Sequence, residues 1–328
     1  MVRSLVFVIA FANSFFNVSA QPVADTIATA LVRQHLSYLS SDSLKGRGNY
    51  TKGLQTAALY IANVYRQEGL NLFPGDSSYF QPFSSLNLTA KDYQADGQGL
   101  YNPGKLLLNI IGVLPGKTKP EEVVLFSAHY DHLGTKASGG GDSIYNGAND
   151  NASGISGLLS LIHYYSSRQD NARTIIFAAF AGEELGLLGS QAFVRRLLPK
   201  AIKAHINIEM IGHSTIGPNA FFVTGADHSN LAFMLAKTLR GSKIKIKSEP
   251  DIKQELFRRS DNYPFALQGV PAHSIMCSDD SYLCYHAACD DMSQIDIENM
   301  ARIIRAVATA CQPIIDGKQT PSRIKRIK

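Results

Sequence analysis

The sequence lacks several features that would assign it to a common functional class. The apolar run near its start is too short to cross a bilayer, and no Cys directly follows that run to carry a lipid. No C-x-x-C pair is present, so we expect no structural zinc site built from thiolates. The net charge of +5 comes partly from the final residues KQTPSRIKRIK, and no second basic cluster is interleaved with aromatic residues. These absences argue against a stable membrane anchor and against a nucleic-acid partner.

The first twenty residues predict an export signal. Arg3 supplies a positive charge before the apolar stretch SLVFVIAFA, and the segment VSA, which ends at Ala20, supplies small residues for signal peptidase. Cleavage is expected near Ala20 and Gln21, which would make the mature protein secreted or periplasmic. The alternative is an N-terminal hydrophobic helix that is retained.

Only four cysteines are present, and all of them follow residue 276. Export would make disulfides possible, and four cysteines allow three connectivities. Cys277 and Cys284 flank the loop SDDSYL, so we expect these two to pair. Cys311 falls on the apolar face of a helical pattern and is expected to remain a buried thiol.

The composition is that of a globular protein with a sizeable core, because 45% of the 328 residues are hydrophobic and 18% are charged. Two helical patterns come first, and apolar strand patterns then alternate with amphipathic helix patterns. Continuous apolar strands that alternate with helices predict an α/β fold in three layers, with a mixed, mainly parallel central sheet between helices. The expected helices cover 26–41, 54–70, 153–167, 183–198 and 229–240, with a last one through 300–311, and the expected strands cover 122–130, 173–182, 204–212, 220–225, 243–248 and 272–277.

No internal repeat or low-complexity linker interrupts this pattern. We therefore expect a signal peptide over residues 1–20, one catalytic domain over 21–316 and a basic C-terminal tail over 317–328.

Polar residues stand at the ends of the predicted strands, which is where ligands of open α/β sheets bind. Two imidazoles and three carboxylates among them suit two zinc ions, with one carboxylate as a bridge. Each ion would keep an open position for water, as in hydrolases with two catalytic metals. The five residues that could converge in this way are His129, Asp150, Glu184, Glu209 and His286.

Two further carboxylates fit the same chemistry. Glu183 precedes the expected ligand Glu184, and it could take a proton from a metal-bridged water and pass it to the leaving amine. Asp131 stands two residues after His129, so its carboxylate could accept the other ring N–H and fix the tautomer.

Each of these residues also has an ordinary structural explanation. Asp150 could cap a helix that starts near Ala152. Glu183 and Glu184 could belong to the first turn of a helix, where carboxylates are favourable. The occurrence of all five at strand or loop ends favours the metal site. Six other histidines are expected to be structural or exposed: His35, His163, His205, His213, His228 and His273.

At these motifs the chain resembles the co-catalytic zinc aminopeptidases. That family includes secreted bacterial leucyl and broad-specificity aminopeptidases and relatives of glutamate carboxypeptidase and glutaminyl cyclase. The resemblance covers nearly all of the mature chain and implies a sheet of about eight strands, peptide substrates and two zinc ions per chain. We expect a monomer. The motifs that carry it, in family order, are SAHYDHLG, NGANDNASG, FAGEELGLLGS, INIEMIG, RSDNYPF and CYHAACDD.

The resemblance also implies a role for each metal ligand. His129 and Glu209 would hold one zinc ion. Glu184 and His286 would hold the second, and Asp150 would bridge the two. The family usually has Asp at the position of Glu209, so the longer side chain could weaken or reposition that ion.

Three more residues receive roles by the same resemblance. Glu183 would be the general base and Asp131 the supporting carboxylate, and Tyr285 would help to stabilise the tetrahedral oxyanion. The implied activity is that of a zinc-dependent exopeptidase, most simply an aminopeptidase. Two other departures from the family, Asn149 and Asn262, remove no expected ligand.

Three rival interpretations share parts of the pattern. Aminoacylases have a similar ligand order but insert a dimerisation domain, and only 102 positions separate Glu184 from His286 here. Glutaminyl cyclases hold a single zinc ion and lack the first-metal histidine, which is present here as His129. A receptor-like relative without metals would have no reason to keep all five ligands and Glu183.

Overall fold

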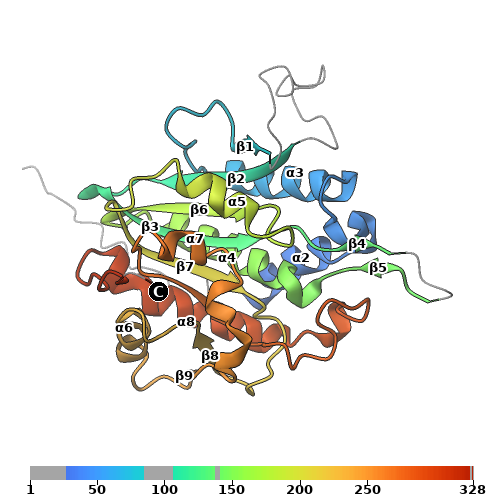
Figure 1. The fold of residues 1–328 in the computed structure, drawn as a ribbon. Helices are drawn as coiled ribbons and strands as arrows, with labels where there is room; N and C mark the ends of the chain where they lie inside the picture. The colour runs from blue at the N-terminus through green and yellow to red at the C-terminus, as the bar shows by residue number, and fades with distance from the viewer. Residues whose placement is uncertain (1–26, 85–105, 137–140, 326, 328) are drawn as a thin grey trace, which may run out of the picture.

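The computed structural model describes residues 27–84, 106–136, 141–325 and 327, and the expected signal peptide lies outside them. An eight-stranded sheet in the order β1-β2-β6-β3-β7-β10-β8-β9 forms its centre (Figure 1). Its strands are β1 (Phe80–Phe83), β2 (Leu107–Leu114), β3 (Lys119–His129), β6 (Arg173–Phe180), β7 (Ile202–Glu209), β8 (Ala220–Val223), β9 (Lys245–Lys247) and β10 (Ala272–Met276); β4 (Gly134–Thr135) and β5 (Ile144–Tyr145) pair separately.

The sheet is mixed and mainly parallel, as the sequence predicts. The central strand β3 runs parallel to β6 and β7, β7 runs parallel to β10, and β8 runs parallel to β9. The antiparallel pairs are β1 with β2, β2 with β6, and β8 with β10. Every residue of β2, β6, β8 and β10 is buried, which explains why these strands read as continuous apolar runs.

Helices cover both faces of the sheet (Figure 1). On one face Val124, Phe126 and Ala128 of β3 pack with α2, α3, α4 and α8, and on the other face Val123 and Leu125 pack with α5 and α7. This alternation along β3 is what a strand buried on both faces requires. The helices are α2 (Thr29–Leu39), α3 (Lys52–Gln67), α4 (Gly154–Arg168), α5 (Leu188–Val194), α6 (Leu231–Thr238), α7 (Tyr263–Ala266) and α8 (Ile297–Ile315). Shorter helical turns are η1 (Asp42–Arg47), η3 (Ala148–Ser153), η4 (Ile252–Gln254), η5 (Leu256–Arg258) and η6 (Met292–Gln294).

One expected helix starts later than the sequence pattern indicates. A helix was expected over 183–198, but α5 begins at Leu188. The backbone amides of Glu183 and Glu184 donate to the carboxylate of Asp131, at 3.2 and 3.3 Å. Because a turn fixes these two residues at the end of β6, they are not carboxylates of a first helical turn.

The expected disulfide is wrong. Cys284 pairs with Cys289, five residues on, with their Cα atoms 5.3 Å apart. Cys277 directly follows β10 and is instead a buried free thiol. Its Sγ contacts the carbonyl oxygen of Ala220 at 3.5 Å. Cys311 is buried and free, as the helical pattern indicates.

The chain after α8 packs onto the sheet. Arg173, at the start of β6, donates hydrogen bonds to the carbonyls of Ile314 and Gln319, both at 2.7 Å. Ile324 is buried against the same core as α5 and α7. The segment after α8 therefore contributes apolar surface to the fold as well as basic charge.

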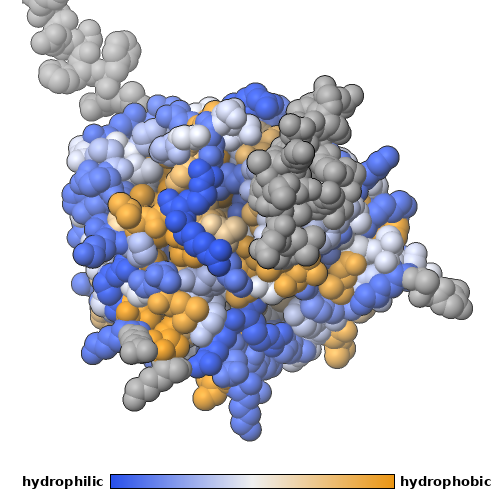
Figure 2. Space-filling model, turned by 45° about the horizontal axis from the view of Figure 1, so that its top comes forward, coloured by the Kyte–Doolittle hydropathy of each residue, from blue (hydrophilic) through white to orange (hydrophobic). Residues whose placement is uncertain are grey.

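Within the described residues no helix is long and apolar enough to cross a membrane. On the face shown in Figure 2, hydrophobic residues form several patches that are separated by hydrophilic ones.

Candidate metal centre

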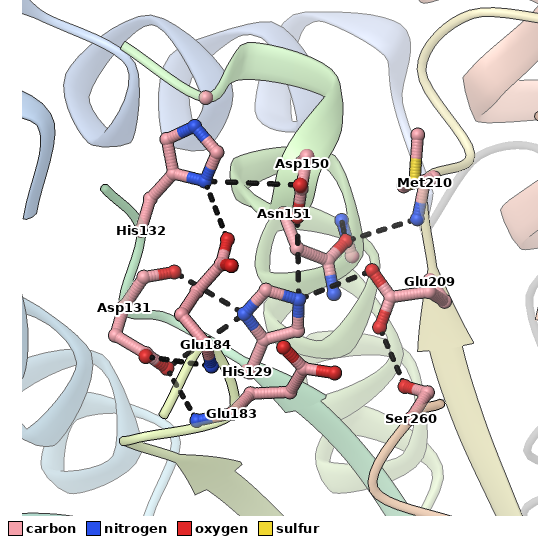
Figure 3. A network of polar contacts seen from close by, with 12 residues as sticks. His129, Asp131, His132, Asp150, Asn151, Glu183, Glu184, Glu209, Met210 and Ser260 are labelled. Atoms are coloured by element: carbon pink, nitrogen blue, oxygen red, sulfur yellow. Dashed lines mark hydrogen bonds and ion pairs between the residues drawn. The ribbon is translucent and has the colours of Figure 1, made fainter. Parts of the chain in front are cut away.

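Two of the candidate residues end neighbouring strands of the sheet. His129 is the last residue of β3 and Glu209 is the last residue of β7. These strands pair in parallel, so their carboxyl ends meet at the same edge. His129 Nε2 lies 3.1 Å from Glu209 Oε1, and both residues are buried (Figure 3).

Asp150 lies in η3, the irregular turn just before α4. The backbone amides of Asn149 and Asp150 donate to the carboxylate of Asp290, at 2.9 and 3.0 Å. Asn151, not Asp150, accepts the hydrogen bond from the Gly154 amide at the start of α4. The Asp150 carboxylate is therefore not used as a helix cap and points into the site.

Asp150 stands between two imidazoles. Its Oδ1 lies 3.4 Å from His129 Nε2, and its Oδ2 lies 3.2 Å from His286 Nε2. Glu184 Oε2 lies 3.2 Å from the same nitrogen of His286. All five candidate residues thus converge, with Asp150 at the centre.

The donor atoms divide into two groups that share Asp150. His129, Asp150 and Glu209 form what we call the three-donor group. His132, Asp150, Glu184 and His286 form the four-donor group, in which the ligand-type atoms all lie within 4.8 Å of one another.

The donor set fits zinc. Imidazole nitrogens and carboxylate oxygens are ordinary zinc ligands, and three carboxylates in a buried space need a compensating positive charge. The guanidinium of the buried residue Arg47 is engaged by backbone carbonyls. Divalent metal would supply compensating positive charge.

The charges of the site shift one another's protonation. Burial raises the pKa of Asp150, but the imidazoles of His132, His129 and His286 outweigh this and hold it well below its ordinary value. Burial lowers the pKa of His286, but hydrogen bonds with Asp150 and Glu184 raise it to about 10. A metal ligand must be an ionised carboxylate or a neutral imidazole, so an ion that binds here would displace the protons that the carboxylates favour on the imidazole rings.

A pocket opens onto the three-donor group. It is lined by His129, Glu209 and Glu183, by the shared residue Asp150, and by His286 of the four-donor group. Burial raises the pKa of Glu183 well above its ordinary value, and the neighbouring Glu209 adds to this while His129 opposes it. A carboxylate with a raised pKa in the lining of a pocket can accept and return a proton.

Comparison with known proteins identifies the family. The model of peptidase family M28 matches residues 109–311.

The chain belongs to peptidase family M28. It is 33% identical over 334 residues to a probable zinc metalloprotease of Pyrenophora tritici-repentis, an alignment that covers 89% of this chain and 74% of the relative. It is also similar to leupeptin-inactivating enzyme 1 of Streptomyces exfoliatus, with 26% identity over 93% of this chain and 66% of that protein. Aminopeptidase YwaD of Bacillus subtilis is 29% identical over 66% of this chain and 47% of its own length. The chain thus spans about half to two thirds of the length of these last two relatives.

Solved structures share the fold. A zinc aminopeptidase from Bacillus subtilis superposes with a TM-score of 0.66 at 18% identity, over 90% of this chain and 97% of the other. A glutaminyl cyclase from Porphyromonas gingivalis superposes equally well, with a TM-score of 0.66 at 17% identity over 89% and 100%. The M28 membership confirms the expected class of enzyme, a zinc-dependent peptidase, and the expected α/β fold.

The other expected site residues of this M28 chain have specific neighbours. His129 Nδ1 lies 3.2 Å from the carbonyl oxygen of Asp131 and 3.7 Å from its carboxylate. That carboxylate also accepts from Asn49 Nδ2 at 2.7 Å and from two amides of the turn after β6. Asp131 therefore links the His129 ring to the turn that carries Glu183 and Glu184.

Tyr285 lines the pocket beside the site. Its ring stacks on that of His286 with centroids 4.0 Å apart, and its hydroxyl lies 3.4 Å from a guanidinium nitrogen of Arg259. Burial raises the pKa of Tyr285, so its hydroxyl stays protonated and can donate a hydrogen bond.

The departures from the family pattern are accommodated by local hydrogen bonds. Glu209 uses its second oxygen, Oε2, to accept from Ser260 Oγ at 2.8 Å. Asn149 accepts two backbone amides at Oδ1. Asn262 donates to the carbonyl of Phe257 and accepts from Ser274. Neither asparagine is among the donors of the two groups.

Sequence reasoning missed three residues of the site. His132, to which no role was assigned, contributes to the four-donor group. Arg47 donates to carbonyls on both sides of the site, including Tyr130 at 2.9 Å and Gly147 at 2.9 Å. Asp290 fixes the turn that carries Asp150. In the sequence, the H-x-D-H spacing was an available indication of His132, and the CDD segment after His286 was one of Asp290.

Proposed function

We propose that this chain is a zinc-dependent exopeptidase, most simply an aminopeptidase, whose two zinc ions are held by His129, Asp150, Glu184, Glu209 and His286. The observation that supports this most directly is the central position of Asp150, with one oxygen near the three-donor group and the other near His286. The zinc ions, when bound, would polarise the scissile carbonyl and activate a water molecule.

Glu183 is the proton carrier in this proposal. Its carboxylate opens to the pocket beside His129 and Glu209, and burial has raised its pKa. It takes a proton from the attacking water and gives that proton to the nitrogen of the leaving amine. A base that neighbours a ligand but stays off the metal explains why the sequence carries two adjacent glutamates.

Tyr285 and Asp131 assist from either side. Tyr285 lines the pocket, and its hydroxyl donates a hydrogen bond to the oxyanion that develops on the substrate. Asp131 holds the turn of Glu183 and Glu184 through their backbone amides, so the base and the ligand keep their relative positions.

The pocket also offers an apolar wall. Met210, Leu256 and Met276 line it next to the donors. This wall suits an apolar side chain at the substrate residue whose bond is cleaved.

Export and a monomeric state are part of the proposal. The Cys284–Cys289 disulfide supports an oxidising compartment, outside the cytoplasm. N-terminal sequencing of exported protein should start near Gln21, and light scattering should give the mass of one chain.

A panel of substrates on zinc-loaded protein tests the function. Aminoacyl-nitroanilides and free-amine dipeptides should be cleaved, whereas N-blocked dipeptides should not. Cleavage of N-blocked substrates only would replace the aminopeptidase proposal by a carboxypeptidase.

Glutaminyl cyclisation is the second candidate, because the fold matches a cyclase and an aminopeptidase equally well. The zinc content separates the two. Two ions with peptide cleavage support the peptidase, one ion with ammonia release from a glutaminyl peptide supports the cyclase, and no zinc supports a receptor-like protein.

A further inference from the structure

His132 occupies a position that the five-ligand proposal leaves unexplained. It follows β3 by three residues, and its side chain is fully buried. Its ring packs so tightly on Gly147 that a Cβ atom there would lie 2.5 Å from Cδ2 of His132. The ring is therefore held in one place, with Nδ1 directed at Glu184 and Asp150 (Figure 3).

The distances around Nδ1 match a metal site. A tetrahedral zinc ion with bonds of about 2.0–2.1 Å separates its ligand atoms by about 3.3 Å. His132 Nδ1 lies 2.9 Å from Glu184 Oε1 and 3.8 Å from Asp150 Oδ2, which bracket that value. His286 Nε2 lies 3.2 Å from oxygens of both carboxylates. The two rings thus approach the same pair of carboxylates.

The two rings face a common space. The His132 and His286 rings are 5.8 Å apart between centroids and lie at 66° to each other. Each oxygen of Glu184 contacts a different ring: Oε1 faces His132 and Oε2 faces His286. Among the described residues, Nε2 of His132 has no hydrogen-bond partner, so the polar contacts of the ring all lie on the Nδ1 side.

We propose that His132 binds zinc through Nδ1 in the four-donor group. This inference rests on the proposed function, because it adds a ligand to one of the two ions placed there. That ion then has four protein ligands, as structural zinc ions do, whereas the ion of the three-donor group has three and keeps an open position.

The pocket supports the same asymmetry. Its lining includes the whole three-donor group and the base Glu183, but only two members of the four-donor group, Asp150 and His286. The three-donor group would therefore present its open position to the pocket, and the ion held by the four-donor group would help to fix Asp150.

The competing explanation is a hydrogen bond. His132 Nδ1–H could donate to Glu184 and orient it as a ligand, without binding metal. The two explanations predict different results for an asparagine at position 132, which could replace the hydrogen-bond donor but not the zinc ligand. The Asn amide can supply an N–H near the place of Nδ1, but it is a poor zinc ligand.

The test compares His132→Asn with His163→Asn by Zn²⁺ titration of metal-free protein against a competing chelator. His163 is a matched control, because its Nδ1 makes a contact of the same 2.9 Å length with Glu68 on the surface. We expect His132→Asn to weaken the zinc affinity of one of the two sites by more than about 100-fold and to leave the affinity of the other site unchanged. Losing an outer hydrogen-bond partner weakens metal affinity by only about 10–100-fold. His163→Asn should bind as wild type. A loss of 100-fold or less in His132→Asn overturns the proposal.

X-ray absorption at the zinc edge tests the unmodified protein and does not depend on the folding of a variant. Three imidazoles for two zinc ions support His132 as a ligand, and two imidazoles overturn it. A wild-type stoichiometry other than two contradicts the two-zinc site itself, whereas two ions with two imidazoles contradict only the role of His132.

Discussion

The two donor groups of the site rest on different parts of the fold. His129 and Glu209, which belong to the three-donor group alone, end paired strands of the central sheet and are 1% and 4% exposed. The four-donor group comes mostly from loops, and its His286 side chain is 36% exposed. Strand ends are positioned by the hydrogen-bond ladder of the sheet, whereas loop residues need ties of their own.

The loops have such ties. The Cys284–Cys289 disulfide encloses His286 within a short loop, and the Asp290 carboxylate that follows it accepts from the Tyr282 hydroxyl at 2.9 Å. The same carboxylate holds the turn of Asp150. One donor group is thus positioned by the sheet, and the other by a disulfide within one loop and by hydrogen bonds between loops.

The largest effect is expected from removing the strand-borne carboxylate. Glu209→Ala should lose one zinc equivalent and most peptidase activity, because the three-donor group keeps only His129 and Asp150. The four-donor group should retain its ion, and the protein should stay folded. Zinc analysis by mass spectrometry, turnover and circular dichroism measure these outcomes.

Graded chelation of the wild-type protein gives the matching control. The ion of the three-donor group has fewer protein ligands, so the chelator should remove it first. Glu209→Ala with both zinc equivalents and full activity would show that Glu209 is not a ligand.

Glu183→Gln separates chemistry from metal binding. The amide keeps the shape of the side chain but cannot accept a proton, so turnover should fall by at least ~10²-fold. Both zinc ions should remain, because Glu183 belongs to neither donor group. Turnover close to wild type in the Gln variant would remove Glu183 from the mechanism.

Ser260→Ala tests how the three-donor group is supported. Its hydroxyl donates to Glu209 Oε2 at 2.8 Å, and losing such an outer partner should weaken zinc binding by roughly 10–100-fold. Only the ion of the three-donor group should be affected. Competitive zinc titration measures both affinities. Ser167→Ala is the control, because the Ser167 hydroxyl donates to the helix carbonyl of Tyr164. An equal loss at both ions would contradict the separate support of the two groups.

The smallest expected effect comes from opening the loop that holds His286. Cys284→Ser with Cys289→Ser should lower the free energy of unfolding by about 2 kcal/mol, the entropy term for a loop this short. The zinc affinity of the four-donor group should fall, and that of the three-donor group should not change. Chemical unfolding and zinc titration test this.

A thiol count supports the same experiment. Denatured, unreduced wild type should show two free thiols, from Cys277 and Cys311. Four free thiols in exported protein would mean that the disulfide does not form, and an unchanged zinc affinity in the double variant would show that it does not position His286.

Much of the fold followed from periodicity. The expected strands from 122 onward and the helices at 26–41 and 54–70 occur within three residues of their expected ends, because continuous apolar runs need burial on both faces. The helix over 183–198 was too long, because its first residues use their amides to hold Asp131.

The site was predictable where the sheet carries it. His129 and Glu209 could be expected together, since residues that end parallel strands share an edge. His132 could not be assigned, because spacing alone does not show the direction of a side chain in a loop. The cysteine pairing failed for the same reason: Cys277 and Cys289 are both close to Cys284 in sequence, and only the path of the loop decides between them.

The sequence by itself determined the layered α/β fold, the buried strands and the supply of imidazoles and carboxylates at the strand ends, because these depend on local patterns of apolar and polar residues. The tertiary structure decided which of those groups meet. Asp150 reaches both groups because Asp290, some 140 positions away, fixes its turn, and His132 faces Glu184 because Gly147 leaves room for its ring. Contacts between residues so distant in sequence arise from the packing of loops against one another, and no local pattern encodes them.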